Sequence, residues 1–335
     1  MTYKDSAITE NMFSYWLSTY KSDFLSYYNS SFESEEFWNS PATADMTAEE
    51  YAMDIIIQNI KYTLVGIQLF REYALKIPAE LTEAINSDIN EKIEYFGGRS
   101  ELNVELSAFG INIDMLRDIY IAEEKLYAVY DYLYGTNGTE KVSDAKVDEY
   151  YKSNYSRIKY IMVNTFEKPA YNEDGSQKYD SEGLRVTEPL SEEELAAKHE
   201  KINEIMMCVN AGDEFDDIMA QFNEVDMSGY PNGFYVSGNE LGIFGFAMVN
   251  EVAAMQVGEV RKISDNVVTC IVQKCPLIER SAFTDRDLEQ LESLEDNCIQ
   301  QEYEKKFSAF ADEIVVDEET LSRFSIRLAA PNSYF

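Results

Sequence analysis

The hydrophobic period changes twice along the chain, and this change constrains the fold more than any other feature. At both ends, apolar residues recur every three or four positions, which is the spacing of an amphipathic helix. Between about Ile158 and Leu277, short runs rich in β-branched residues alternate with helical stretches. The order predicts an α+β protein in which an all-helical lobe, built from both termini, flanks an inserted α+β domain.

Four helices are predicted in the first third of the chain. The first covers TENMFSYWLSTYKSDFLSYY, with Thr9 or Asn11 as its N-cap. The others cover 47–76, 78–95 and 113–134, and a Gly-Gly turn at 97–98 separates the last two. A long helix at 284–311 is predicted near the end, followed by a short strand-like piece.

The middle of the chain predicts strands and shorter helices. Strands are expected at 158–163, 233–236 and 267–273, and helices near 191–209, 214–222 and 249–255. Ser191 opens a capping box, and a short helix is capped near Ser143. The turn-rich segment 166–189 predicts a mobile hairpin inserted after the first strand. At 335 residues the chain is long enough for two or three units, and we place the boundaries at 1–153, 154–279 and 280–335.

Composition narrows the function. Sixty-two acidic residues against 28 basic ones give a formal charge of −34, which repels phosphate backbones and anionic membranes, so nucleic acid is excluded as a partner. The four cysteines form no disulfide or zinc spacing and are interpreted as buried thiols. The single histidine, His199, builds no metal site or triad alone, and the acidic runs lack the ligand alternation of a calcium loop. We expect no metal and no cofactor.

No stretch is long and apolar enough to cross a membrane, because the longest candidate is broken by Asp54, Gln58, Asn59 and Lys61. The start, MTYKDSAITENMF, has no charged and apolar leader segments. An export signal is therefore either absent or was removed.

Several ordered segments resemble the extracytoplasmic parvulin foldases of the PrsA and SurA kind. The lead-in VSDAKVDEYYKSNYSRIKYIMV resembles the helix and first strand of their peptidyl-prolyl isomerase domain, and AGDEFDDIMAQFNE resembles its second helix. The glycine turn YPNGFYV, then MQVGEV and VVTCIVQKCPL, resemble the elements that follow. The resemblance covers about 120 residues of this sequence and implies a parvulin-like, FKBP-type half-barrel inserted in a chaperone lobe.

The family's catalytic positions are substituted here. Rotation about an X-Pro bond is slow because amide resonance must be broken, and the family uses two histidines and a cysteine or aspartate as a polar network. The corresponding positions in this chain are Tyr160 for the first histidine, Cys270 or Thr269 for the second, and Val225 for the cysteine or aspartate. Whether the chain is an enzyme is left open, and the resemblance implies a degenerate active site.

The apolar part of the family's pocket is kept better. The residues that hold the proline ring align with Phe244 and Met248, and Phe234 or Val236 lines the same shelf. Phe234 and Val236 fit a purely structural core role better, whereas Phe244 and Met248 fit a core role and a peptide-binding role equally. These four residues are the predicted substrate-binding set.

Aromatic residues are also plentiful in the helical lobe, and a partly exposed subset would form a surface for unfolded chains. This series comprises Phe13, Tyr15, Trp16, Tyr20, Tyr28, Tyr120, Tyr127, Tyr130 and Tyr134.

Three functions compete. We favour a foldase or chaperone that holds non-native secreted or envelope proteins without catalysis. An active peptidyl-prolyl cis-trans isomerase (rotamase) working through shape and desolvation is the second, and a non-catalytic structural component of the cell envelope is the third. The resemblance implies an extracytoplasmic protein, secreted or lipid-anchored as a lipoprotein through a leader, and a dimer held by the helical lobe.

Overall fold

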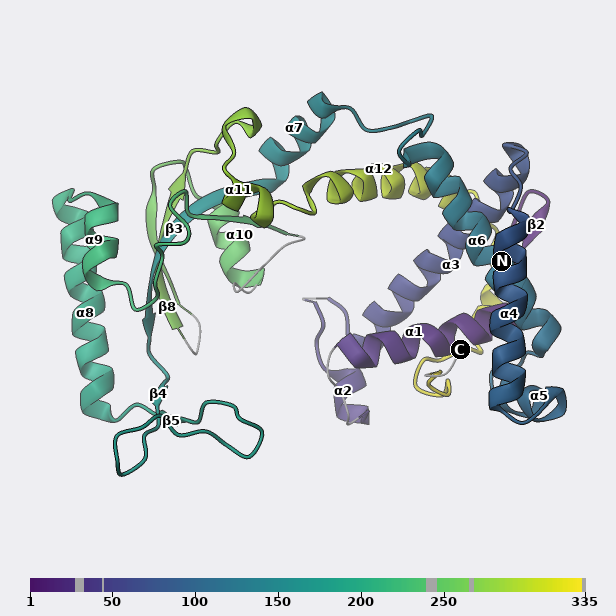
Figure 1. Cartoon of the computed structure of the whole chain (residues 1–335), viewed down its shortest axis with the longest axis horizontal. Helices are drawn as coiled ribbons and strands as arrows, with labels where there is room; N and C mark the ends of the chain where they lie inside the picture. Colours follow the sequence, from purple (N-terminus) through teal and green to yellow (C-terminus); the bar gives the residue numbers. More distant parts are fainter. Residues whose placement is uncertain (28–32, 44, 239–245, 265–267, 333–335) are drawn as a thin grey trace. The chain divides into compact units, whose positions relative to one another are not determined.

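The computed structural model describes residues 1–27, 33–43, 45–238, 246–264 and 268–332. The chain divides into two compact units (Figure 1). Unit 1 comprises Met1–Val142 and Ile299–Phe335, and unit 2 comprises Ser143–Cys298. Helices drawn from both termini make unit 1, and unit 2 carries a four-stranded antiparallel sheet with helices on it. The predicted α+β class is confirmed.

Unit 1 is helical apart from one small hairpin. Its elements are β1 (Thr2–Tyr3), β2 (Ser6–Ala7), α1 (Glu10–Tyr27), α2 (Glu35–Asn39), α3 (Ala48–Glu72), α4 (Ala79–Tyr95), α5 (Arg99–Ser107), α6 (Ile113–Tyr134), α12 (Leu294–Ala311), which begins in unit 2, and α13 (Glu318–Leu321). The hydroxyl of Thr9 accepts the Met12 N–H at 3.3 Å, so Thr9 rather than Asn11 caps α1. The four predicted helices are confirmed.

The long helices α3 and α6 pack side by side and form the centre of unit 1. Both helices present buried residues, among them Leu64 and Leu116, along their facing sides. Gly66 allows the close approach, because a Cβ atom there would lie 2.5 Å from Cδ1 of Leu126. A larger side chain at this position would push the two helices apart.

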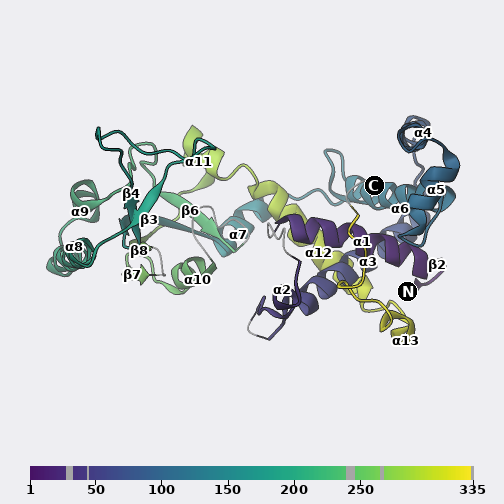
Figure 2. The same ribbon diagram turned by 90° about the horizontal axis from the view of Figure 1, so that it is seen from below.

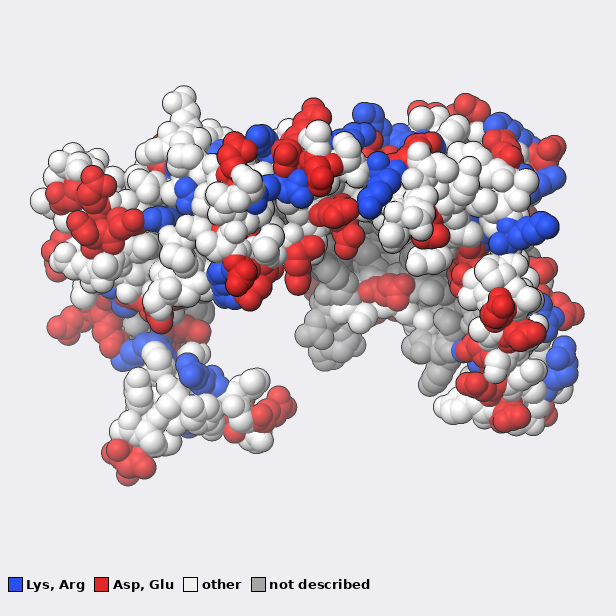
Figure 3. All heavy atoms as spheres, turned by 45° about the horizontal axis from the view of Figure 1, so that its top comes forward, with Lys and Arg blue, Asp and Glu red and all other residues white. Residues whose placement is uncertain are grey.

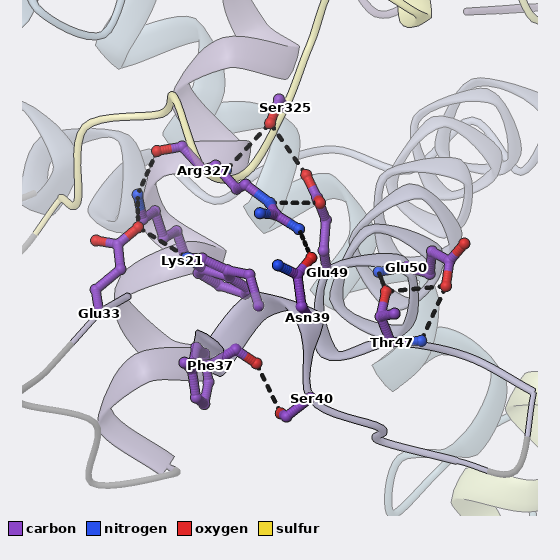
Figure 4. A network of polar contacts seen from close by, with 11 residues as sticks. Lys21, Glu33, Phe37, Asn39, Ser40, Thr47, Glu49, Glu50, Ser325 and Arg327 are labelled. Atoms are coloured by element: carbon purple, nitrogen blue, oxygen red, sulfur yellow. Dashed lines mark hydrogen bonds and ion pairs between the residues drawn. The ribbon is translucent and has the colours of Figure 1, made fainter. Parts of the chain in front are cut away.

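The C-terminal segment is held on unit 1 by a polar network (Figure 4). Lys21 is buried, and its Nζ donates to the carbonyl oxygens of Arg327 at 3.2 Å and Ala329 at 2.7 Å. The same ammonium pairs with Glu33 at 2.6 Å. The Arg327 guanidinium in turn binds Glu49 of α3 at 2.5 Å. The last part of the chain is thereby fastened to elements near its beginning.

Unit 2 has a mixed order of helices and strands. Its elements are α7 (Asp144–Asn154), β3 (Tyr155–Asn164), β4 (Glu167–Pro169), β5 (Thr187–Pro189), α8 (Glu192–Ala211), α9 (Phe215–Phe222), β6 (Phe234–Ser237), α10 (Phe246–Ala254), β7 (Val260–Ser264), β8 (Val268–Cys275), a 3-10 turn (Arg280–Ala282) and α11 (Asp285–Gln290). The sheet order is β6-β3-β8-β7, with every neighbouring pair antiparallel. The capping box predicted at Ser191 is present, since Ser191 and Glu194 bond each other's backbone N–H.

The two faces of this sheet carry separate cores, because side chains alternate along each strand. Helices α8 and α9 cover one face, where Ile161 and Ile271 pack against them. Helix α10 covers the other face, where Tyr160 and Cys270 lie (Figures 1 and 2). The sheet is thus a layer buried on both sides.

Some local predictions differ from the structure. The predicted helix 284–311 is interrupted at Leu291–Ser293 and forms α11 and α12. Helix α5 follows the Gly-Gly turn directly and was not predicted, and neither was strand β7. In the tail, Val315 bridges to Thr2, and the short helix α13 follows.

The units also divide the chain at other residues than the predicted 154 and 279. Both α7 and α11 belong with the sheet, whereas the prediction placed them in the helical lobe. Tyr151 of α7 explains this, because its ring lies 6.1 Å from that of Tyr235 on β6 and 5.5 Å from that of Phe283 before α11.

Among the described residues, no helix has the length and apolar character needed to span a membrane.

The predicted hairpin insert is confirmed as a paired structure. Strands β4 and β5 pair antiparallel, and the segment between them forms two turns closed by the bridges Tyr171↔Gln177 and Tyr179↔Arg185. The Gln177 side-chain amide lies where the two turns meet and donates to the carbonyls of Ala170, Lys178 and Val186. Large apolar side chains exposed on this insert are Phe166, Tyr171, Tyr179 and Leu184.

Candidate functional site

One face of the unit 2 sheet brings together most of the predicted site residues. Tyr160, Cys270 and Val236 all belong to the apolar cluster between the sheet and α10. Phe234 and Met248 pack against the same cluster from its margin. Residues predicted from separate stretches of sequence therefore meet in one place.

Tyr160 and Cys270, which were predicted at catalytic positions, are inside the core. Tyr160 is 1% exposed and Cys270 is 0% exposed. They lie on the adjacent strands β3 and β8, where Tyr160 is opposite Val272 and Cys270 is opposite Met162. Burial raises the pKa of Tyr160 to about 12, with smaller contributions from Cys270 and Tyr230. The Tyr160 hydroxyl therefore stays protonated near neutral pH and cannot act as a base there.

The margin of the cluster is partly open to solvent. We call its partly buried side chains the apolar rim, and they are Met162, Met227, Phe234, Met248, Ile263 and Val268. Methionine adapts its shape to irregular apolar partners, which suits a surface that holds varied peptides. The rim, rather than the buried residues, is the part of this face that a ligand can reach.

Phe234 is the aromatic centre of the rim. Its ring lies 5.4 Å from the Tyr160 ring below it and is stacked at 4.1 Å on the ring of Tyr230. The Arg286 guanidinium lies over the other ring of this stack, 4.1 Å from the centroid of Tyr230. Tyr230 and Arg286 were not predicted as site residues. An aromatic stack with a cation on it is visible only once β6 and α11 are placed together.

Val225, which was predicted at the cysteine or aspartate position, lies outside the cluster. It is 36% exposed and sits in the loop after α9. This loop borders a hollow of about 420 Å³ lined by Met219, Ala220, Asn223, Glu224, Val225, Asp226, Met227 and Ser228. Met227 belongs to both the hollow and the apolar rim, so the two adjoin. Phe244 lies outside the described residues.

Asn223 explains why this loop takes its position, and sequence reasoning missed it. Its side-chain Oδ1 accepts the Met162 N–H at 3.0 Å, and its Nδ2 donates to the Tyr160 carbonyl at 2.9 Å. Strand β6 pairs only with residues 155–158 of β3. The Asn223 amide bonds to β3 just beyond this paired part. An asparagine after a helix is too common for this pairing to be recognised in a sequence.

Glu224 fixes the same loop electrostatically. Its carboxylate binds Lys198 at 2.6 Å and Lys201 at 3.0 Å, both on α8, and accepts the Asn164 N–H at 3.0 Å. Burial opposes ionisation of this carboxyl, but the two ammonium groups and the N–H outweigh it and lower the pKa of Glu224. The group is an anchor rather than an acid or base.

No cluster of three or more metal-ligating side chains occurs among the described residues. The acidic run that begins α8 serves the helix itself. Lys168 and the capping contacts with Ser191 lower the pKa of Glu194 to about 2. This carboxylate is thus used in capping.

The helical lobe buries much of its aromatic series. Among the described members, Phe13, Tyr15, Trp16 and Tyr134 are buried, whereas Tyr127 is 67% exposed. Tyr20, Tyr120 and Tyr130 are partly exposed, and Tyr28 lies outside the described residues. Acidic side chains are spread widely over the visible surface (Figure 3).

The elements define an α+β protein with a helical unit and a sheet-containing unit, the latter bearing an apolar rim. No protein-family model and no curated protein sequence matches the chain. Solved structures of PrsA do match.

The PrsA crystal structure from Bacillus subtilis is 13% identical and covers 87% of this chain and 93% of its own, with a TM-score of 0.25. The foldase protein PrsA from Streptococcus pneumoniae is 14% identical to this chain, with a TM-score of 0.27. The match covers 84% of this chain and 96% of that protein. The peptidylprolyl isomerase PrsA from Bacillus cereus is 16% identical to this chain, with a TM-score of 0.30. The match covers 86% of this chain and 96% of that protein.

Proposed function

We propose that this chain is an extracytoplasmic foldase of the chaperone type, which holds non-native exported polypeptides and lacks an efficient isomerase centre. One observation carries the proposal. Tyr160 and Cys270 are enclosed in the apolar cluster, whereas Phe234 and Met248 remain accessible at its margin. The accessible part of the site is apolar, and the polar part is inaccessible.

This arrangement suits binding better than catalysis. Isomerisation is accelerated only by contacts that are stronger to the twisted X-Pro bond than to the planar one. The apolar rim offers contact area that planar and twisted peptides share, and Tyr160 contributes no titratable group near neutral pH. Such a surface binds both forms about equally, which raises affinity but not rate.

The remaining parts of the proposal concern partners and place. The partners are unfolded or partly folded exported proteins, which expose the apolar segments that the rim accommodates. The protein acts in the cell envelope or outside it, tethered through a lipidated leader, and pairs with a second copy through the helical lobe. Size measurement by light scattering and sequencing of the native gene's first codons test these two points.

A protease-coupled assay on a proline peptide tests the catalytic part. We expect a rate indistinguishable from the uncatalysed one. A rate enhancement that falls on Met248→Ala or Phe244→Ala, but not on the exposed control Val257→Ala, would favour the active isomerase instead. The comparison is decisive because only the first two variants alter the predicted pocket.

Suppression of aggregation tests the holding function. The client is a reduced, permanently unfolded protein present at stoichiometric amounts. We expect the chain to keep it soluble and Phe234→Ala to weaken the effect, with Val257→Ala unchanged. If the wild-type chain leaves aggregation unaltered, the structural envelope role becomes the better explanation.

A further inference from the structure

The open edges of the unit 2 sheet differ in whether another group covers their backbone N–H and C=O groups. A strand edge exposes unpaired backbone N–H and C=O groups, which recruit another extended chain unless something covers them. In this sheet the open positions are the outer sides of β6 and β7 and the part of β3 beyond β6. The β3 position is closed by Asn223, whose amide takes the place of a peptide unit.

A second side-chain amide closes β6. Gln290 of α11 accepts the Tyr235 N–H at 3.4 Å and donates to the Gly233 carbonyl at 3.2 Å. A side-chain amide therefore covers each of these two edges, although the two residues come from unrelated segments of the chain. Both protect the sheet against pairing with another chain.

Strand β7 has no such cover from any described residue. The Lys274 N–H donates to the Glu259 carbonyl at 3.0 Å, and this bond fixes the alternation of the ladder. Arg261 and Ile263 accordingly bond to β8, and the N–H and C=O of Lys262 point outward. No hydrogen bond from the described side chains or strands reaches them.

A groove runs beside this open edge. It has a volume of about 680 Å³ and is lined by Asn250, Glu251, Ala254, Arg261, Lys262, Ile263 and Ser264. Helix α10 forms one wall and β7 the other, and the two lie side by side in Figure 2. The volume is within the range of about 300 to 1,000 Å³ typical of ligand sites.

The charges in the groove select the occupant. The Arg261 guanidinium is already paired with two carboxylates, Glu251 at 2.7 Å and Glu259 at 2.6 Å. Lys262 is exposed and has no ion pair with any described residue. Two copies of the chain joined edge to edge would bring their Lys262 side chains near each other, which disfavours self-pairing. A strand with an acidic residue at that position is favoured instead.

We propose that β7 and α10 form a strand-addition site for an extended segment of a non-native polypeptide. The segment pairs its backbone with Lys262, places an apolar side chain against Ala254 and Ile263, and places an Asp or Glu beside the Lys262 ammonium. This inference rests on the proposed holding function and defines the ligand as an extended, acidic and apolar strand. It is a site separate from the apolar rim, because it recognises the main chain of the client.

The test measures binding of a labelled, end-capped peptide in which Val alternates with Glu and Thr, by fluorescence anisotropy with the full chain. Lys262→Pro removes the outward N–H at a position where an edge strand tolerates proline. Because one backbone hydrogen bond is lost, we expect affinity to fall about fivefold. The matched control Lys262→Ala keeps the N–H and should lose only the ion pair, a smaller effect. Urea unfolding checks that both variants fold.

Two further peptides make the test independent of protein folding. N-methylation of alternate residues blocks one edge of the peptide, and methylation of the intervening residues blocks the other. We expect one methylated peptide to bind like the parent and the other to fail.

Each contrary result has a distinct meaning. Equal binding of both methylated peptides, or equal affinity of wild type and Lys262→Pro, overturns strand addition and leaves the holding function intact. A wild-type chain that binds neither the peptide nor the reduced client overturns the holding function and this site together. A dimer in sedimentation that Lys262→Pro dissolves, with peptide affinity unchanged, assigns the edge to self-association and overturns the proposal.

Discussion

Tyr235 on β6 donates its phenolic hydrogen bond to the buried carboxylate of Asp287 on α11, at 3.0 Å. The same carboxylate accepts bonds from Asn232 at 2.8 Å and from the backbone and hydroxyl of Thr284 at 2.8 and 2.7 Å. One side chain therefore caps a helix and fastens it to the sheet. A buried charge is tolerated here because each oxygen has donors.

Asp287→Ala is expected to destabilise unit 2 by about 3 kcal/mol, because it leaves several buried donors unpaired at once. Asp287→Asn keeps the volume and part of the bonding, so we expect a smaller loss. Urea unfolding followed by tyrosine fluorescence measures both. A matched control is Asp296→Ala at the exposed start of α12. Equal midpoints for Asp287→Ala and Asp296→Ala would show that the buried carboxylate contributes nothing.

Stability of unit 2 is expected to fall in acid. Burial opposes ionisation of Asp287, but the bonds from Thr284, Asn232 and Tyr235 prevail and lower its pKa; the pKa of Glu224 is lowered as well. A carboxyl whose folded pKa is depressed stabilises the fold above its unfolded pKa of about 4, and this contribution is lost as pH falls through the folded value. We expect the urea midpoint of the wild type to drop below pH 4. In Asp287→Asn the drop should be shallower, and an identical slope would contradict this assignment.

Asn223→Ala is expected to open the edge of β3. The variant leaves the Met162 N–H and the Tyr160 carbonyl without the amide that pairs with them, which costs about 1 to 3 kcal/mol. An uncovered edge also promotes association, so light scattering should rise with protein concentration. Asn90→Ala, at an exposed position of α4, is the control and should change neither quantity. Unaltered unfolding and scattering in Asn223→Ala would count against the edge-closing role.

Helices with strong local signals could be predicted, and elements decided by tertiary contacts could not. Helix α3 has a capping box at Thr47 and a wide apolar face, which act within a few turns. The predicted helix 284–311 breaks because Asp287 and Gln290 bind the turn and strand at Asn232 to Tyr235, and this fixes the direction of α11. Those partners lie more than fifty positions away in sequence. The charged strand β7 has too short an apolar pattern to be recognised alone.

For the site, the resemblance pointed to Tyr160 and Cys270, and the structure places both on the same face of the sheet. Their depth was not predictable, since it depends on how α10 covers that face. The exposure of the Val225 side chain was also not predictable from the sequence. Its place in the sequence is beside the site, but Asn223 and Glu224 hold the loop so that its side chain is exposed.

Lys21→Met is expected to loosen the C-terminal segment of unit 1. Methionine keeps most of the apolar stem but removes the ammonium that binds the Arg327 and Ala329 carbonyls and Glu33 (Figure 4). Losing these partners inside the protein costs about 2 to 4 kcal/mol, because two carbonyls and one carboxylate lose their donor.

Hydrogen exchange measures this loosening directly. Amides from 325 to 332 should exchange faster in Lys21→Met, while those of α6 change little, because α6 packs on α3 rather than on this ammonium. Lys76→Met, at an exposed position, is the control and should leave the segment protected. If the segment exchanges at the same rate in both variants, its attachment comes from Ile326 and the Arg327–Glu49 pair instead of from Lys21.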